Sequence, residues 1–563
     1  MKFISKKTGG LLFTIVFTMV LASFNFEKRQ VKPNFVFILT DDQSYGFMGC
    51  TGNKDVQTPN IDNLASSGTL FTNAHITSAI CTPSRTSILL SQFERKHGVN
   101  FNSGTSVSDD AWKNAYPVVM REAGYYTGWV GKNHVPIGKG GYESGLMEKS
   151  FDYWYAGHGH LGFYPKKRHG IFDGAKFDTQ VEVLEEGMVD FLTNEKKEIL
   201  AKRFIETRPK DQPFMLSVCF NLPHGAGTGS MKMKDSDKEI YKSLYRDKQL
   251  KVSENYVAKE NIKEPKLPLD IHHVSDRQTG YNYVDTPEKT IERYTRQIQA
   301  MTGIDLFVGQ LRTTLKKEGL DKNTIIVFTS DHGLFMGEQG LGGKAFCYEQ
   351  TTHVPMIVYN PSSTKKVRGI KSNALVQSID IAPTLLKLAG IEIPKSYQGK
   401  EFTALLKGEN EVHREFLFTE NLWSNHFGNP RCDAIQNKKW KYIRYYKNEN
   451  FSAVRKIETA KNLGIPVNKM LYGVHDGQIA IYRSYIDSPK MNEEAVYEEL
   501  YDLSRDPNEL NNIVGDPAYE SQLALLKKEW AKAIEQARGS GKPEVYRYTM
   551  DSQTEKGVLM EPK

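Results

Sequence analysis

Acidic, basic and imidazole side chains gather at four places along the chain, each directly after a short apolar run. They are Asp41 and Asp42; Lys132 and His134; His224; and Asp331 and His332. Paired carboxylates in such a setting can hold a metal ion, and histidine can move protons because its unperturbed pKa lies near neutral pH. Taken one at a time, each group is more often a turn, a helix cap or a surface residue. Their repeated position after apolar runs favours one shared site.

The apolar runs have the pattern of buried strands bounded by turn residues. They cover Phe35–Leu39, Tyr125–Val130, Phe214–Phe220 and Thr324–Thr329. Helical patterns lie between them, most clearly at Thr290–Lys317, so strands and helices alternate and the sheet should be largely parallel. In open parallel sheets, ligands bind at the carboxyl ends of the strands. We therefore expect an α/β fold, a large mostly parallel sheet flanked by helices, in which the four polar groups converge.

Two stretches have the pattern of insertions over this crevice. Phe151–Phe172 mixes aromatic and basic side chains, namely Tyr153, Trp154, Tyr155, His158, His160, Lys166, Lys167, Arg168 and His169. Such a surface suits a charged sugar, although a solvated loop with a few packed aromatic residues has the same composition. Gly225–Pro287 is long, rich in lysine and weakly periodic, which is typical of a functional lid or of a disordered segment.

The last part of the chain has a different pattern. Phe416–Thr419 and Trp440–Tyr446 indicate strands, and Glu520–Arg538 indicates one amphipathic helix. We expect a small antiparallel sheet with a terminal helix, placed after the helical Ile379–Ala389. A length of 563 residues also favours two domains. The predicted division is an α/β domain at residues 31–410 and a C-terminal α+β subdomain at residues 411–563.

The start of the chain has the pattern of a secretory signal peptide. Lys2, Lys6 and Lys7 precede the apolar Leu11–Ala22, and the small residue Ser23 follows. This run is shorter than the roughly 20 apolar residues of a spanning helix, so an uncleaved anchor is the weaker alternative and no stable membrane span is expected. We predict a signal peptide at residues 1–22 and an exported protein, periplasmic or secreted.

Charge and cysteine content argue against several classes of protein. The formal charge of +7 falls to +4 without residues 1–22, which carry three lysines and no acid. No basic run is long enough for nucleic acid, whereas a mild positive charge is compatible with an anionic substrate. Five cysteines lie far apart without the spacing of a zinc site, and a disulfide framework is not expected. Only Cys81 has a distinctive setting.

The setting of Cys81 indicates a family. The run Cys81-Thr82-Pro83-Ser84-Arg85 resembles the C-x-P-S-R signature of the sulfatases. Further family motifs match in order and approximate spacing, namely the polar groups above, Lys344, Tyr348-Glu349, Val354-Pro355 and Leu500–Asn512. The resemblance covers nearly all of the chain after Asn34. It departs at Gln92, where glycine is usual, and at His332, where many members carry asparagine.

The resemblance implies a formylglycine-dependent sulfatase with the alkaline phosphatase-like fold, similar to bacterial sulfatases of polysaccharides and glycosaminoglycans. In this family a maturation enzyme oxidises the signature cysteine to formylglycine, whose hydrate attacks sulfur. The residues that the resemblance implies as ligands of one divalent cation are Asp41, Asp42, Cys81, Asp331 and His332. Carboxylates favour a hard ion, so Ca²⁺ is expected, with Mg²⁺ as the alternative.

The other catalytic roles also come from the resemblance. Arg85 and Lys132 would stabilise the deprotonated nucleophile, and Lys344 would bind sulfate oxygens. His134 would act as the base for sulfate release and His224 would protonate the leaving oxygen, although these two roles could be exchanged.

The implied partners are a sulfated carbohydrate substrate and the formylglycine-generating maturation enzyme. Two other functions are compatible with such a fold. One is a phosphatase or phosphodiesterase of the same superfamily, but those enzymes resemble one another in using Ser or Thr with two metal ions, against which Cys81 argues. The other is a protein that binds sulfated glycans without cleaving them and keeps Cys81 as a thiol.

Overall fold

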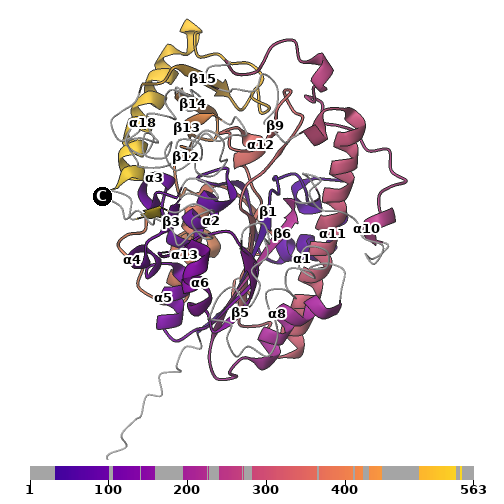
Figure 1. Cartoon of the computed structure of the whole chain (residues 1–563), viewed down its shortest axis with the longest axis vertical. Helices are drawn as coiled ribbons and strands as arrows, with labels where there is room; N and C mark the ends of the chain where they lie inside the picture. The colour runs from indigo at the N-terminus through magenta and orange to yellow at the C-terminus, as the bar shows by residue number, and fades with distance from the viewer. Residues whose placement is uncertain are drawn as a thin grey trace, which may run out of the picture. The chain divides into compact units, whose positions relative to one another are not determined.

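The centre of the molecule is a mixed sheet of eight strands, shown in the computed structural model in Figure 1. In spatial order they are β11 (Ile370–Gln377), β2 (Thr69–His75), β10 (Met356–Tyr359), β7 (Thr324–Ser330), β1 (Asn34–Asp41), β6 (Phe214–Pro223), β4 (Tyr126–Asn133) and β5 (Tyr153–His158). Only β10 runs antiparallel to its neighbours β2 and β7. The four predicted strands are confirmed, and they lie together as β7, β1, β6 and β4.

The structure describes residues 32–99, 105–139, 141–158, 195–224, 226, 240–268, 271, 282–363, 367–409, 412–422, 430–446, 494–539 and 545–547. All elements named here belong to one compact unit, Pro33–Lys563. The predicted signal peptide at residues 1–22 lies outside the described residues. Within the described part of the chain, the helices are too short or too polar to cross a membrane.

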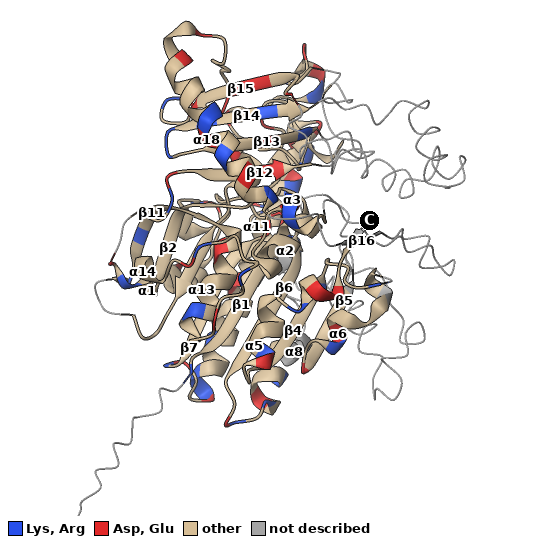
Figure 2. Cartoon of the chain, turned by 90° about the vertical axis from the view of Figure 1, so that its left-hand side faces the viewer, with Lys and Arg blue, Asp and Glu red and all other residues tan. Residues whose placement is uncertain are grey.

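Helices cover both faces of the large sheet because both faces are apolar. Successive residues of β1 point to opposite sides, so Phe35 and Phe37 belong to one core and Val36 and Ile38 to the other. The first core is closed by α2 (Cys81–Leu90), α5 (Tyr116–Glu122) and α13 (Ile381–Leu388). The second is closed by α1 (Pro59–Ser67), α8 (Glu195–Thr207) and α11 (Pro287–Lys317). Figure 2 shows β1, β6 and β4 largely without charged residues.

The predicted helix at Thr290–Lys317 is confirmed as α11 and begins three residues earlier. Its start is set by Thr286, whose side chain accepts a hydrogen bond from the backbone N–H of Lys289, and by Pro287 in the first turn. A hydroxyl cap followed by proline is a favourable helix start because it satisfies one free N–H and removes another.

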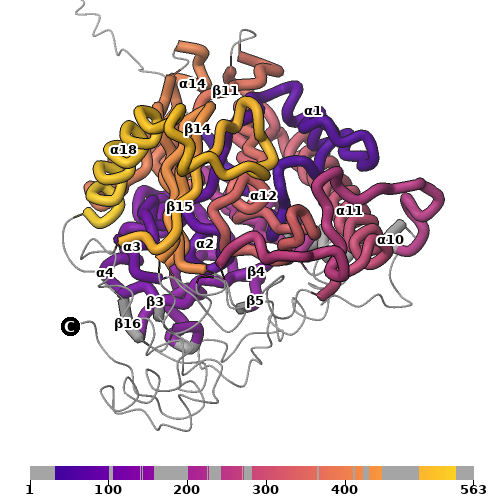
Figure 3. Tube along the Cα trace, turned by 90° about the horizontal axis from the view of Figure 1, so that it is seen from above, coloured from indigo at the N-terminus to yellow at the C-terminus, as the bar shows by residue number. Residues whose placement is uncertain are grey.

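A second, antiparallel sheet follows in the chain, as predicted. Its strands in order are β12 (Leu417–Asn421), β13 (Arg431–Gln436), β14 (Trp440–Tyr446) and β15 (Tyr497–Asp502). The helix α18 (Glu520–Arg538) packs Leu526, Trp530 and Ile534 against Ile435 and Tyr442 of this sheet. Figures 1 and 3 show α18 beside β14 and β15 from two directions. Residues 410 and 411 are not described, so the domain boundary predicted there stays a prediction.

The first predicted insertion proves to begin with a strand. Tyr153, Trp154 and Tyr155 lie in β5, which pairs in parallel with β4 at the edge of the large sheet. The expectation that they belong to an inserted loop is therefore wrong, because backbone pairing with β4 overrides the loop-like composition. His158 is the last residue of the same strand. The remaining aromatic and basic residues named for this stretch, His160, Lys166, Lys167, Arg168 and His169, lie outside the described residues.

The remaining elements are short. They are α3 (Glu94–His97), β3 (Thr105–Val107), α4 (Asp109–Trp112), α6 (Leu146–Lys149), α10 (Ile240–Ser243), β8 (Phe335–Met336), β9 (Gly342–Gly343), α12 (Glu349–Thr352), α14 (Thr403–Lys407) and β16 (Val545–Arg547). The second predicted insertion, Gly225–Pro287, contains α10 and two single-turn 3-10 helices at Lys259–Asn261 and Asn282–Val284. Much of it lies outside the described residues.

Candidate active site

Cys81 is the first residue of α2, where a helix presents unpaired N–H groups and the positive end of its dipole. Every residue of this helix is buried. Ser84 Oγ donates a hydrogen bond to the carbonyl oxygen of Asp331 at 2.5 Å, and Thr82 Oγ1 donates to that of His134 at 2.6 Å. These bonds join the start of α2 to the ends of β7 and β4, so Cys81 is held at the carboxyl edge of the sheet.

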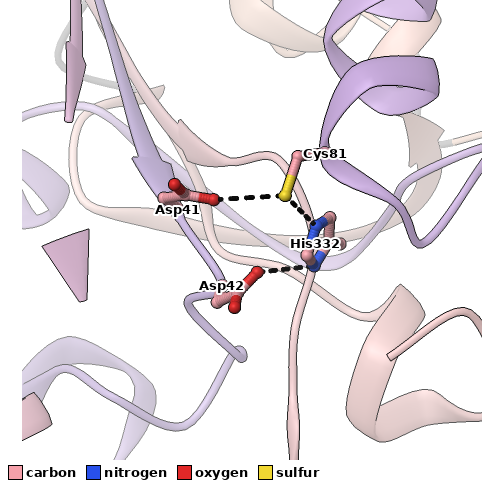
Figure 4. A group of neighbouring side chains, drawn as sticks. All are labelled: Asp41, Asp42, Cys81 and His332. Carbon is pink, nitrogen blue, oxygen red and sulfur yellow. Dashed lines mark hydrogen bonds and ion pairs between the residues drawn. The ribbon is translucent and has the colours of Figure 1, made fainter. Parts of the chain in front are cut away.

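Four of the predicted metal ligands form a tight cluster, here called the catalytic group: Asp41, Asp42, Cys81 and His332 (Figure 4). Their ligand atoms all lie within 4.8 Å of one another, and all four residues are buried. Cys81 Sγ lies 3.6 Å from Asp41 Oδ1 and 3.3 Å from His332 Nε2. On its other side, His332 Nδ1 lies 3.2 Å from Asp42 Oδ1. The ends of β1 and β7 and the start of α2 therefore converge.

Two backbone features allow these strand ends to approach. Asp42 has a φ of 60°, a left-handed conformation that aspartate tolerates better than most residues. Gly333 directly follows His332, and a Cβ atom there would come within 2.0 Å of the carbonyl oxygen of Gln350. The glycine of Asp-His-Gly is therefore required by a close backbone contact.

Asp331, the fifth predicted ligand, is held by protein donors through both carboxylate oxygens. Its Oδ1 accepts hydrogen bonds from the backbone N–H groups of Asp42 at 3.1 Å and His332 at 2.9 Å. Its Oδ2 accepts one from Arg85 Nε at 2.8 Å. Asp331 thus links the β1 and β7 loops to α2, and its role as a metal ligand stays a prediction.

Basic side chains neutralise these acids from several elements. Lys132 of β4 contacts Asp41 Oδ2 through Nζ, and an Arg85 terminal nitrogen lies 3.7 Å from Asp41 Oδ1. Lys344, which follows β9, places Nζ 3.0 Å from both Asp42 Oδ1 and Cys81 Sγ. All three cations are buried. An anion placed at Cys81 would therefore be stabilised by cations that are already in position and shielded from water.

The two predicted acid–base histidines are positioned differently. His224 directly follows β6, and its Nε2 lies 3.5 Å from Asp42 Oδ2, with 13% of the side chain exposed. His134 follows β4, is 3% exposed and is tied to α2 through its own carbonyl oxygen, which accepts from Thr82. The structure thus brings the imidazole ring of His224 to the catalytic group. For His134, the contact with the site is made by its backbone carbonyl, which fixes the end of β4 against α2.

Burial and neighbouring charges shift the pKa values of this site in opposite directions. Burial would raise the pKa of Asp41, but Lys132 and Arg85 outweigh it and hold that pKa well below its usual range. For Asp42, burial and the like charges of Asp41 and Asp331 prevail, and the pKa is raised. The pKa of His332 rises to about 9 because Asp331, Cys81 and Asp42 overcome the effect of burial. The space between Asp42 and His332 therefore favours added positive charge.

Some contributors to this geometry were not predicted. Thr82 and Ser84 hold the start of α2 in place, and only their position inside the C-x-P-S-R run could have indicated it.

A second cluster with metal-ligand side chains, here called the His75 group, consists of His75, Glu349 and His353. Glu349 and His353 are four residues apart, but His75 at the end of β2 is far from both in the sequence, so no local spacing signals the whole cluster.

Comparison with protein-family models gives two matches. Residues 33–391 match the model described as Sulfatase, and residues 337–460 match the model described as N-sulphoglucosamine sulphohydrolase, C-terminal. The first covers more than half of the chain and includes every predicted site residue.

Curated proteins and solved structures show similarity over most of the chain. An N-acetylglucosamine-6-O-sulfatase of Bacteroides thetaiotaomicron is 26% identical, over 95% of this chain and 92% of that protein. An ulvan-active sulfatase of Formosa agariphila is 25% identical, over 94% of this chain and 89% of that protein. The solved structure of a 2-O GAG sulfatase has a TM-score of 0.63 at 19% identity, covering 94% and 95% of the two chains. That structure shows a common fold.

Proposed function

The chain belongs to the sulfatase family and is a sulfuric ester hydrolase, and we propose that it removes sulfate from an anionic carbohydrate using a formylglycine made from Cys81. The observation that carries this proposal is the position of Cys81 Sγ, within 3.0–3.6 Å of Lys344, His332 and Asp41. A thiol needed only for packing would not lie among an amine, an imidazole and a carboxylate. A phosphatase or a non-catalytic glycan-binding protein is not favoured by the family match.

The donor set of the catalytic group, together with Asp331, fits a hard divalent cation. The carboxylates of Asp41, Asp42 and Asp331 meet in a fully buried space, and burial raises the pKa of Asp42, so positive charge there is stabilising. Asp41, Asp42, His332 and the residue derived from Cys81, with Asp331, would hold the ion. Bound there, Ca²⁺ or Mg²⁺ would lower the pKa of the nucleophile and polarise the sulfate.

The formal charges of the site also suit a sulfate ester. The three carboxylates are matched by three buried cations, Arg85, Lys132 and Lys344. A divalent ion would then leave two positive charges in excess. A sulfate monoester and a deprotonated nucleophile carry one negative charge each, so the loaded site would be close to neutral.

Each side chain has a role that its position supports. The hydrate of formylglycine would supply the attacking hydroxyl. Lys132 and Arg85, anchored on Asp41 and Asp331, would stabilise its deprotonated form, and Lys344 would exchange its contact with Cys81 for sulfate oxygens.

Histidines would move the protons. His224 is partly exposed beside Asp42, where a leaving sugar oxygen can reach it, and would protonate that oxygen. His134 would take the proton whose removal releases sulfate. The role of His224 rests on its position and on the family resemblance, whereas the role of His134 rests on the resemblance.

The substrate class is an anionic, sulfated glycan. It is supported by the relatives named for N-acetylglucosamine-6-O-sulfatase and ulvan-active sulfatase activity. We also propose that the protein is exported, with a signal peptide at residues 1–22, a catalytic domain at residues 31–410 and a C-terminal subdomain at residues 411–563. Extracellular sulfatases among the relatives support export.

The mass of the peptide that contains Cys81 tests the nucleophile directly. Protein made in a host with the maturation enzyme should show a loss of about 18 Da at Cys81, the calculated change from thiol to aldehyde. Cys81→Ala should keep the fold and lose activity on sulfated glycans. An unmodified Cys81 in active protein, in a host shown to convert another sulfatase, would refute the proposed nucleophile.

His224→Ala tests the general acid. A sugar alcohol is a poor leaving group and needs a proton, whereas a nitrophenol does not, so the variant should slow sulfated sugars by on the order of 100-fold or more and aryl sulfates far less. The measurement is kcat/KM on both substrate types. Equal losses on the two would remove His224 from this role.

A further inference from the structure

Two cysteines from distant parts of the chain meet beside the active site. Cys347 lies three residues after Lys344, just before α12, and Cys432 is the second residue of β13. Their Sγ atoms are 3.5 Å apart, and both residues are completely buried. Cys50, Cys81 and Cys219 are free thiols in the structure as well, and among the described residues the contact between two cysteines is that of Cys347 with Cys432.

The surroundings of the pair are partly polar and connect it to the nucleophile. Asn421 of β12 places Nδ2 3.6 Å from Cys347 Sγ and 3.9 Å from Cys432 Sγ. The Oδ1 of the same side chain accepts a hydrogen bond from the backbone N–H of Ala79 at 3.0 Å. Ala79 lies two residues before Cys81. The two thiols therefore stand at a junction of β12, β13, the Lys344 segment and the segment that leads into α2.

We propose that Cys347 and Cys432 form a disulfide bond in the exported protein. The side chains of a disulfide must already face each other with their sulfur atoms close, and a thiol–thiol contact of 3.5 Å between buried residues meets that condition. The inference depends on the proposed export, because disulfides persist in oxidising compartments, and it does not depend on the sulfatase reaction.

The reaction is an exchange with the disulfide of a thiol oxidase in the same compartment. One cysteine thiolate attacks the oxidase disulfide and forms a mixed disulfide, and the second cysteine displaces the oxidase from it. Two electrons and two protons pass from Cys347 and Cys432 to the oxidase, which leaves as a dithiol. Because both residues are buried after folding, the exchange takes place while the chain folds.

The bond would fasten catalytic segments to the second sheet. It would close a ring from residue 347 to residue 432 that includes β10, β11, α13 and β12. Lys344 lies three residues before the start of this ring, and Asn421, which holds Ala79, lies inside it. Closing a loop of this length lowers the conformational entropy of the unfolded chain. Because the folded chain loses much less entropy, the bond stabilises the native state. It also restrains the segment that carries Lys344.

Alkylation in denaturant tests the bond. Wild-type protein exported to a bacterial periplasm is unfolded without reductant, treated with iodoacetamide and digested with trypsin, which cuts after Lys344 and Arg431. The expected result is one linked pair of peptides containing Cys347 and Cys432, about 2 Da lighter than the two thiol peptides together. Cys50 and Cys219 should be alkylated in the same sample and serve as internal controls. Alkylation of both Cys347 and Cys432, or pairing of either with Cys50 or Cys219, would overturn the proposal.

Thermal unfolding with and without reductant provides the second measurement. Reductant should lower the Tm of the wild type by on the order of a few degrees, whereas the Cys347→Ala/Cys432→Ala variant should not respond to it. Equal responses of the two proteins would contradict the bond. The Cys81 peptide in the same digest reports formylglycine separately, so failure of this inference and failure of the proposed nucleophile are distinguishable.

Discussion

The catalytic group and the His75 group have similar spacing of their ligand atoms and different sets of donors. Each brings potential metal ligands within 4.8 Å of one another. In the catalytic group, Asp41 and Asp42 stand beside a third buried carboxylate, Asp331. In the His75 group, Glu349 faces two imidazoles and accepts a hydrogen bond from Lys441 Nζ at 2.7 Å.

The His75 group is already an ion-pair network. Lys441 also lies 2.8 Å from Glu509 Oε1, and it overcomes burial to hold the pKa of Glu349 well below its usual range. Burial lowers the pKa of His353 to about 4, and its Nε2 donates to the carbonyl oxygen of Thr72 at 2.9 Å, so this ring is neutral. Gln436 Nε2 lies 3.1 Å from His75 Nε2. Proximity of ligand atoms is therefore insufficient for a metal site. The catalytic group and Asp331 offer three carboxylates, which a hard ion prefers, whereas the His75 group offers one carboxylate and two imidazoles that already have protein partners.

Matched carboxylate-to-amide substitutions give the largest expected difference between the two groups. Asp42→Asn should lower calcium affinity at least about 100-fold, with a loss of activity on the order of 1,000-fold, because it removes a charged oxygen ligand. Glu349→Gln should leave calcium affinity unchanged. Calorimetric titration and the rise of Tm with added calcium report binding independently of activity.

The same pair of variants can break the comparison. If Glu349→Gln removes a bound calcium or zinc ion that Asp42→Asn retains, the His75 group is a metal site and its assignment as an ion-pair network is wrong. If both variants retain calcium, the ligand role of Asp42 is wrong.

Removing the cation of the His75 group should have the next largest effect. Lys441→Met leaves the partly buried Glu349 and the fully buried Glu509 without their shared partner, so the free energy of unfolding should fall by about 3 kcal/mol. The control is Lys439→Met, one residue before β14, where the lysine side chain is 52% exposed. This substitution should change the free energy of unfolding by under about 1 kcal/mol. Urea unfolding measures both. A Lys441→Met protein as stable as the control would show that the network contributes no net stability.

Lowering the pH should reduce the stability that the His75 group contributes, by less than the Lys441→Met substitution does. The folded-state pKa of His353 lies below the unfolded value of about 6.5, so the unfolded chain binds more protons between these values. The stability contribution is complete above pH 6.5 and is lost as the pH falls towards about 4. The His353 side chain is 20% exposed, so solvent reduces the effect of its shifted pKa. We expect the free energy of unfolding to be about 1–2 kcal/mol lower at pH 5 than above pH 6.5.

His353→Gln tests this pH dependence, since glutamine does not titrate. Its free energy of unfolding should vary less than that of the wild type across a urea series from pH 7.5 to pH 4.5. Parallel curves for the two proteins would mean that His353 takes up its proton at the same pH in the folded and unfolded chains.

The amino-acid sequence by itself determines the sheet strands and the residues that follow them. Runs such as Phe35–Leu39 and Phe214–Phe220 are apolar on both faces, and this local property is enough to predict buried parallel strands with Asp41 and His224 at their ends. The C-x-P-S-R run likewise indicates the family before any folding is considered, and the family match confirms it.

Contacts between distant segments were settled by folding. Tyr153 looks like a loop residue until β4 supplies backbone partners, and Cys347 and Cys432 look unrelated until β13 packs beside the Lys344 segment. The hydrogen bonds to both carboxylate oxygens of Asp331 and the assembly of the His75 group also depend on contacts between distant segments. Local patterns report burial and periodicity, whereas these features depend on which segments become neighbours and on how their charges balance after water is excluded.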